Sequence, residues 1–194
     1  YNNCEEINGL ENLNTSLATG FSNMFNNCST VTNLNLSNFD TSNVLDMNQM
    51  FNMCESLGTL DLSNFDTTNV VNMHLMFAYC PNLKTLNISN FDTRNLLYAT
   101  SMFIYDSGLE SLDLSNFDTR QVEDMSGMFG DCENIKSIKL GQNFDKMTGE
   151  GMFAGCSGLK AIITTRTSIM ALNNSATTNI HLKNVSDAIL YVPT

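Results

Sequence analysis

Hydrophobic residues recur along this chain with a long period. The pair Met-Phe returns in four steps of 26 residues and a final step of 24, at Met24-Phe25, Met50-Phe51, Met76-Phe77, Met102-Phe103, Met128-Phe129 and Met152-Phe153. Self-similarity at a period of roughly 20–50 residues is typical of a solenoid or a propeller, in which each unit buries its apolar edge against its neighbours. The period therefore predicts a column of stacked coils.

One half of each unit alternates between apolar and polar residues. In the second full unit, Leu60 and Leu62 alternate with Thr59 and Asp61, which predicts a short strand with one buried face. Stacked units would align these strands into a parallel sheet whose other face is open. We expect that open face to be polar, because its positions hold Asn35, Asp61, Asn87, Asp113 and Lys139.

The other half of the unit changes period. Val44, Met47, Met50 and Phe51 are spaced i, i+3, i+6 and i+7, which predicts the inner face of one or two helical turns. The preceding residues Thr41 and Ser42 are candidate N-caps. Together the two halves predict an α/β solenoid, a right-handed array with short parallel strands on one face and short helical turns on the other.

The regularity of the repeat divides the chain into three parts. Residues 1–27 hold a degenerate unit and are predicted to form an N-terminal capping repeat. Residues 28–160 hold about five tandem repeats of 26 residues. Residues 161–194 lose the repeat and regain alternation near their end, which predicts a C-terminal cap of short strands that covers the last open edge.

Five of the six cysteines form one column, three residues after the Phe of each Met-Phe pair: Cys28, Cys54, Cys80, Cys132 and Cys156. Residues of one column in parallel coils lie about 4.8 Å apart, slightly beyond the ~3.5–4.5 Å between Cβ atoms that a disulfide prefers. We therefore expect buried free thiols that act as small apolar side chains. No paired spacing such as CxxC indicates zinc.

Asparagine and aspartate also recur by column where the strand ends, at Asn38, Asn64, Asn90, Asn116 and Asn143 and at Asp40, Asp66, Asp92, Asp118 and Asp145. Such side chains accept hydrogen bonds from nearby backbone N–H groups in turns, which gives the columns a structural role. The alternative is a line of carboxylates that share calcium ions. The sequence lacks the Gly-rich, doubly acidic spacing of calcium-binding β-rolls. No cofactor is predicted.

The net charge of −11 and the pI near 4.3 argue against nucleic acid and anionic membranes as partners. No run of about 18 apolar residues predicts a membrane span, so no membrane insertion is expected in this segment. The chain begins within the repeat theme and carries no signal-peptide pattern, so we expect a segment of a longer protein. A monomeric module is expected.

The repeat contains the segments LSNFDTSNV (36–44), LSNFDTTNV (62–70) and LSNFDTRQV (114–122), each followed by a Met-Phe pair and usually a Cys. In these segments it resembles the repeat of the BspA-type leucine-rich repeat surface proteins. The resemblance covers about residues 28–159. It implies an extracellular location, at the cell surface or secreted, in a bacterium or sometimes a protist, and adhesion to proteins or glycans of host or neighbouring cells without catalysis. The family has no common ligand motif, so no site residue is carried over.

The fourth full unit departs from the others. Tyr98 replaces Asp46, Asn72 and Asp124 of its column, Ala99 replaces a Met, and Asp106 replaces the column cysteine. These departures, with neighbouring columns, suggest a ligand-binding patch made of Leu97, Tyr98, Ile104, Tyr105 and Tyr79, flanked by Arg94 and Arg120. The alternative is that Tyr98 fills the volume lost at Ala99 and that the other residues cover the outer surface.

No catalytic constellation is visible in the sequence, because its carboxylates recur by column and no serine has a nearby His and acid in triad roles. We therefore expect a non-enzymatic binding module. The alternative is a passive spacer that presents other domains away from the cell wall: the uniform Asn, Ser and Thr columns favour it, whereas the irregular fourth unit favours a binding site.

Overall fold

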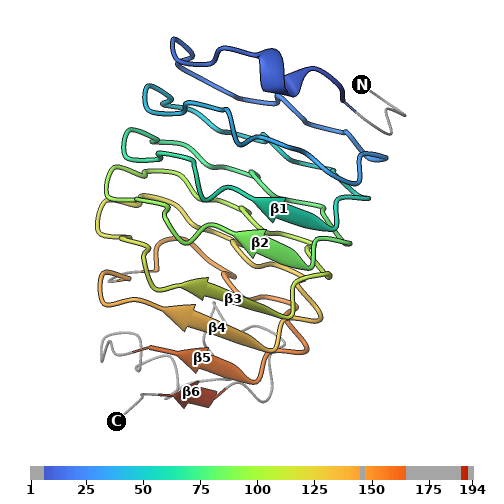
Figure 1. Cartoon of the computed structure of the whole chain (residues 1–194). Helices are drawn as coiled ribbons and strands as arrows, with labels where there is room; N and C mark the ends of the chain where they lie inside the picture. The colour runs from blue at the N-terminus through green and yellow to red at the C-terminus, as the bar shows by residue number, and fades with distance from the viewer. Residues whose placement is uncertain (1–6, 145–146, 165–188, 192–194) are drawn as a thin grey trace.

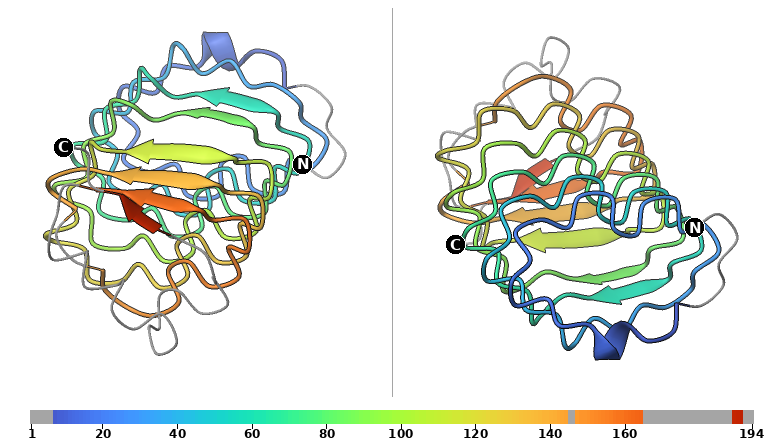
Figure 2. Two further views of the ribbon diagram at one scale, coloured as in Figure 1. Left: turned by 90° about the horizontal axis from the view of Figure 1, so that it is seen from below. Right: turned by 90° about the horizontal axis from the view of Figure 1, so that it is seen from above.

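The structure is a computed structural model that describes residues 7–144, 147–164 and 189–191. The chain forms a stack of coils with a row of short strands along one side (Figure 1). All strands point the same way when the stack is viewed from either end (Figure 2). Parallel strands at the repeat period are those of a repeat solenoid, as the sequence predicted.

The strands are β1 (Thr59–Asp61), β2 (Thr85–Asn87), β3 (Ser111–Leu114), β4 (Ser137–Leu140), β5 (Ala161–Ile163) and β6 (Ile189–Tyr191). Strands β1 and β2 pair in one parallel sheet, and β3 to β6 pair in sequence order in another. Leu60 pairs with Leu86 and Leu112 with Ile138, so the register equals the repeat. Asp61, Asp113 and Lys139 are exposed, as expected of the open face.

The predicted helical turns are wrong. The single helical segment of the described residues is a short 3-10 helix, η1 (Leu10–Asn12), and the side of the coil opposite the strands is built from tight turns. The Gln49 N–H donates to the carbonyl of His74 in the next coil, whereas the Met50 N–H donates back to the Met47 carbonyl at 3.2 Å. This side is therefore a second parallel ladder, in which half of the donors close turns.

On this side of the coil, every second turn has a residue with positive φ at its third position. In the turn from Met47 to Met50 it is Gln49, with φ of 55°, and in the turn from Phe51 to Cys54 it is Met53, with φ of 59°. The first and last residues of a β-turn lie close together, so Met47 and Met50 are both buried. A spacing of three residues therefore fits these turns as well as it fits a helix.

The core consists of columns that run through the stack. The Met-Phe column stacks its rings coil upon coil, with centroids 5.7 Å apart between Phe51 and Phe77 and 5.4 Å apart between Phe77 and Phe103. The described column cysteines are buried free thiols, as predicted. The Cys54 thiol donates to the Phe25 carbonyl of the preceding coil at 3.2 Å, so sulfur also satisfies the backbone.

A buried threonine column joins successive coils, which the sequence prediction missed. The Thr67 hydroxyl donates to the Asp92 carbonyl at 2.9 Å, and in turn accepts from the Asp92 N–H at 2.8 Å. Thr41 is buried in the same way and donates to the Asp66 carbonyl, so it is not a helix N-cap. At Thr15, Thr67 and Thr93 the hydroxyl satisfies both the N–H and the carbonyl of the aspartate in the next coil.

Both the Asn and the Asp column bond to the backbone, but the predicted acceptor role is confirmed only for the Asp column and is wrong for the Asn column. The Asp66 carboxylate accepts from the Thr68 N–H at 2.9 Å within its own turn. Asn64 does the opposite, because its amide donates to the Leu36 and Phe39 carbonyls of the preceding coil at 3.0 and 3.2 Å. Both columns therefore form hydrogen bonds within the stack. This favours a structural role for them over a calcium site.

The ends of the stack are described only in part. Most of the predicted C-terminal cap, residues 161–194, lies outside the described residues, as do Cys4 and Asp145. Strand β6 lies within the run that was expected to regain alternation, and pairs parallel to β5.

Candidate functional site

Some of the residues proposed from the sequence line two separate hollows of the surface, and the others lie outside both. Arg94 and Arg120 line one hollow, and Tyr79 and Tyr105 line the other. The single patch expected from the sequence is therefore divided.

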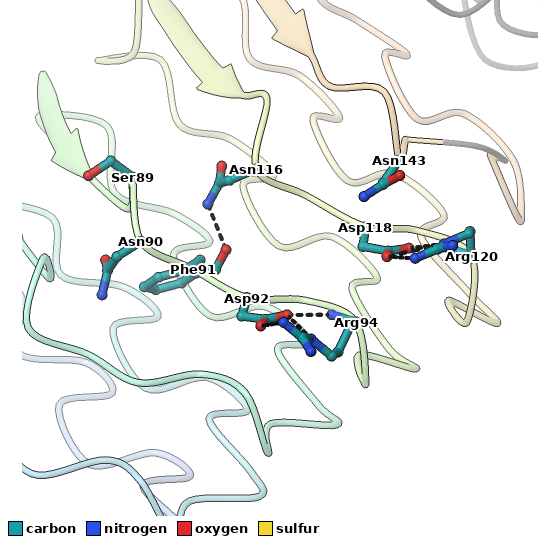
Figure 3. Close-up of a pocket in the computed structure, with 9 residues that line it drawn as sticks. All are labelled: Ser89, Asn90, Phe91, Asp92, Arg94, Asn116, Asp118, Arg120 and Asn143. Atoms are coloured by element: carbon teal, nitrogen blue, oxygen red, sulfur yellow. Dashed lines mark hydrogen bonds and ion pairs between the residues drawn. The ribbon is translucent and has the colours of Figure 1, made fainter.

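The first hollow, of about 420 Å³, lies just after strands β2 and β3 (Figure 3). Each arginine in it is held by the aspartate two residues before it. The Arg94 Nε donates to Asp92 at 3.0 Å, and the Arg120 Nε donates to Asp118 at 3.0 Å. These hydrogen bonds from the guanidinium groups lower the pKa of both carboxyls.

The pairing decides what this hollow presents to a ligand. Each positive charge is already paired, and the hollow is otherwise lined mainly by amides such as those of Asn90 and Asn116. The Asn116 amide donates to the Phe91 carbonyl at 2.7 Å, so it belongs to the asparagine ladder. The first hollow is thus explained by the architecture of the coil.

The second hollow, of about 350 Å³, lies on the turn side. Two tyrosines from successive coils form its aromatic part, and their ring centroids are 5.0 Å apart with an interplanar angle of 22°. Tyr79 is 37% exposed and Tyr105 is 44% exposed. The same hollow is lined by the carboxylates of Glu55, Asp131 and Glu133. None of its lining residues is basic.

The negative charge reaches the tyrosines themselves. Asp131 raises the pKa of the Tyr105 phenol through its charge and a hydrogen bond, which keeps the hydroxyl protonated near neutral pH. The hollow therefore combines exposed aromatic rings with uncompensated negative charge. We call it the tyrosine hollow, made of Glu55, Tyr79, Pro81, Tyr105, Ser107, Asp131 and Glu133.

The remaining predicted residues lie outside both hollows. Tyr98 is 42% exposed, and its hydroxyl donates to the Glu123 carboxylate at 3.1 Å. It therefore does not fill the core volume lost at Ala99, as the alternative interpretation supposed. Leu97 and Ile104 are half-buried, and their carbonyls accept backbone hydrogen bonds from neighbouring coils.

Comparison with protein families identifies the repeat. The family described as "Mycoplasma protein of unknown function, DUF285" matches residues 1–103 and, in a second match, residues 54–166. The chain belongs to the DUF285 family. No curated protein matches it.

One solved structure resembles this DUF285 chain, a leucine-rich repeat protein from Bacteroides ovatus ATCC 8483. The sequence identity is 16% and the TM-score is 0.28. The match covers 88% of the DUF285 chain and 63% of the Bacteroides protein. The DUF285 chain thus spans less than two thirds of that protein.

One unusual residue of the DUF285 repeat, Asp106, was recognised in the sequence only as a substitution. It occupies the cysteine column between Cys80 and Cys132, is fully buried, and accepts the Cys80 N–H at 2.7 Å. Its second carboxyl oxygen has no hydrogen-bond partner. Burial raises the pKa of Asp106 well above its usual value, so the side chain is expected to be protonated over a wide pH range.

The buried thiols are poor nucleophiles. Burial raises the pKa of Cys54 and of Cys156 to about 12, so both remain protonated at neutral pH. In the part of the chain that the structure describes, no group of three or more His, Cys, Asp or Glu side chains is placed to hold a metal ion. No helix among those residues is long and apolar enough to cross a membrane.

Proposed function

We propose that this DUF285 chain is a non-enzymatic, extracellular module of a microbial surface protein, and that it binds proteins or glycans of host or neighbouring cells. The observation that supports this role is the tyrosine hollow. Exposed aromatic residues gathered beside a concavity are enriched where proteins bind partners. The polar ladders, in contrast, serve the coil itself.

The stacked architecture supports the same role. Core columns of Phe, Cys and Thr set the spacing of the coils, whereas exposed columns can vary from coil to coil without disturbing them. The column of Tyr79 and Tyr105 shows this variation, since it also holds Asn27, Met53 and Asp131. A family built in this way could change its partner by substitution at exposed columns alone.

A passive spacer is the second candidate function. The ladders of Thr67, Asn64 and their equivalents repeat with nearly uniform geometry, which suits a stiff rod that holds other domains away from a cell wall. Such a rod needs no binding surface. The two functions therefore differ in whether the exposed tyrosines matter.

The test is binding of the purified module to a panel of immobilised matrix proteins, mucins and glycans at physiological salt. The proposed function predicts saturable binding to at least one of them, weakened when Tyr79 and Tyr105 are both replaced by Asn. Absence of saturable binding across the panel would favour the spacer.

A further inference from the structure

The tyrosine hollow has features that select one kind of ligand. We propose that it binds an arginine side chain presented by a segment of a partner protein, with the guanidinium held against the tyrosine rings and the surrounding carboxylates. This inference rests on the proposed function, because it names the partner chemistry of that same surface.

The aromatic rings provide the first part of the argument. Tyr79 and Tyr105 line the hollow, stack on each other, and are both more than one third exposed. Tyrosine faces carry partial negative charge and attract cations within about 6 Å of the ring centre. A stacked pair presents such faces in a fixed orientation, which lowers the cost of ordering them on binding.

The backbone provides the second part. Tyr79 and Tyr105 have φ of 60° and 62°, a left-handed conformation that disfavours bulky side chains. The same column holds Asn27, Asp131 and Gly155, residue types that adopt positive φ at lower cost. Met53 shares this φ, so the conformation belongs to the turn; what points to a functional use is that two successive coils place an exposed tyrosine there rather than a residue that adopts it at lower cost.

The charges decide between possible ligands. Glu55, Asp131 and Glu133 line the hollow without a basic neighbour among the lining residues. None of these three carboxylates takes part in the ion pairs found in the described part of the chain, which join Arg94 to Asp92, Arg120 to Asp118, Lys136 to Glu110 and Lys139 to Asp113. An anionic ligand would meet repulsion here, and a neutral ligand would leave the carboxylates unused.

Arginine fits better than other cations. Its guanidinium is planar, stacks on aromatic rings and forms paired hydrogen bonds with carboxylates, whereas the lysine ammonium is a compact, strongly hydrated charge. A hollow of about 350 Å³ is near the lower limit for binding pockets, which suits one or two side chains of a segment that passes over the surface.

The test uses a fluorescently labelled peptide that contains two arginines separated by glycine, and the same peptide with citrulline in place of arginine. Citrulline keeps the shape and removes the charge. Affinities are measured with the whole 194-residue chain at physiological salt. We expect saturable binding of the arginine peptide, and binding of the citrulline peptide that is weaker by about tenfold, as expected for loss of a charge that is both paired and stacked.

Matched variants locate the binding. Replacing Tyr79 and Tyr105 together by Asn, a residue that tolerates positive φ, should lower the affinity for the arginine peptide by about fivefold or more. Tyr98→Asn removes an equally exposed tyrosine outside the hollow and should leave the affinity unchanged. Glu55→Gln with Glu133→Gln should weaken binding, whereas Glu123→Gln with Glu150→Gln removes the same charge elsewhere and should have a smaller effect.

Three outcomes would overturn the inference: equal binding of the arginine and citrulline peptides, equal losses from the tyrosine variants inside and outside the hollow, or no saturable binding at all. The panel assay separates this failure from failure of the proposed function. If a ligand from the panel binds equally well to the variant that lacks Tyr79 and Tyr105, the proposed adhesion is supported and the proposed arginine site is wrong. Circular dichroism of each variant verifies that it folds.

Discussion

Among single residues, Asp106 differs most from the others in its column. The cysteines above and below it are neutral and small, and Cys132 donates its thiol to the Phe103 carbonyl. Asp106 instead leaves one carboxyl oxygen buried without a partner. A buried polar group without a partner costs roughly 1–3 kcal/mol, so this coil is predicted to be a weak point of the stack.

Replacing Asp106 by Cys, the column consensus, should raise the free energy of unfolding at pH 7 by roughly 1–3 kcal/mol. The pKa of Asp106 is raised in the folded chain. The folded state is therefore progressively destabilised by this carboxyl as the pH rises from its unfolded pKa of about 3.9 through its folded pKa. The gain on replacement should therefore be smallest near pH 3 and grow with pH.

Urea unfolding of both proteins between pH 3 and pH 8 measures this difference. The lowered pKa values of Asp92 and Asp118 have the opposite effect, since their stabilisation is lost as pH falls, but they are common to both proteins and cancel. A stability difference that does not change with pH would show that Asp106 is ionised in the folded chain.

Positive φ at Met53 gives a second prediction at this scale. Met53 is exposed and, unlike the tyrosines of its column, makes no aromatic stack, so its backbone strain is not offset. Met53→Asn should stabilise the chain by about 1 kcal/mol, the order of the cost of a left-handed conformation for a residue with a Cβ. Thermal unfolding measures it. The control Leu45→Asn, also exposed but without positive φ, should change stability little.

At the scale of the element, the coil is held by backbone hydrogen bonds and by side chains that imitate them. The alternation of Leu60, Asp61 and Leu62 was sufficient to predict a strand. The spacing of Met47, Met50 and Phe51 was not sufficient, because a helix and a series of four-residue turns bury the same positions. A signal that separates them is Asn, Asp or Gly at the third turn position, as at Asn27 and Gly127, but this coil holds Gln49 and Met53 there and so lacks it.

The threonine ladder gives a prediction for the element. Thr67→Val keeps the shape but leaves the Asp92 N–H and carbonyl without the hydroxyl that serves both. We expect a loss of roughly 1–3 kcal/mol in unfolding free energy, because two partly buried backbone groups lose their hydrogen-bond partner. Thr59→Val, on the exposed face of β1, is the control. If the Thr67 variant loses no more stability than the Thr59 variant, the threonine hydrogen bonds do not stabilise the stack.

At the scale of the whole molecule, the period alone predicted the parallel stack, because each unit must bury its apolar edge against the next. The site was harder to predict. Sequence columns indicated that Tyr79 and Tyr105 are exposed, but they could not show that Tyr98 bonds to Glu123, away from the hollow. Which exposed columns meet around one concavity depends on the path of the turns, and that path was predicted wrongly.

A linear stack predicts that position along it controls the cost of a core mutation. Phe77 stacks on Phe51 and Phe103 in the middle, whereas Phe25 lies in the first coil of its ring column. Phe77→Ala should cost roughly 3–5 kcal/mol, and Phe25→Ala should cost less, because terminal coils fray before the rest unfolds. Equilibrium denaturation compares them, and equal costs would count against a linear array.

The adhesive role and its site are both tested by the binding of the purified chain to the panel of matrix proteins, mucins and glycans, with the Tyr79→Asn, Tyr105→Asn double variant measured in parallel. We expect saturable binding by the original chain and a clear loss of binding in the folded variant. Saturable binding that the variant retains in full would contradict the tyrosine hollow as the binding surface, and no binding by either protein would contradict adhesion itself.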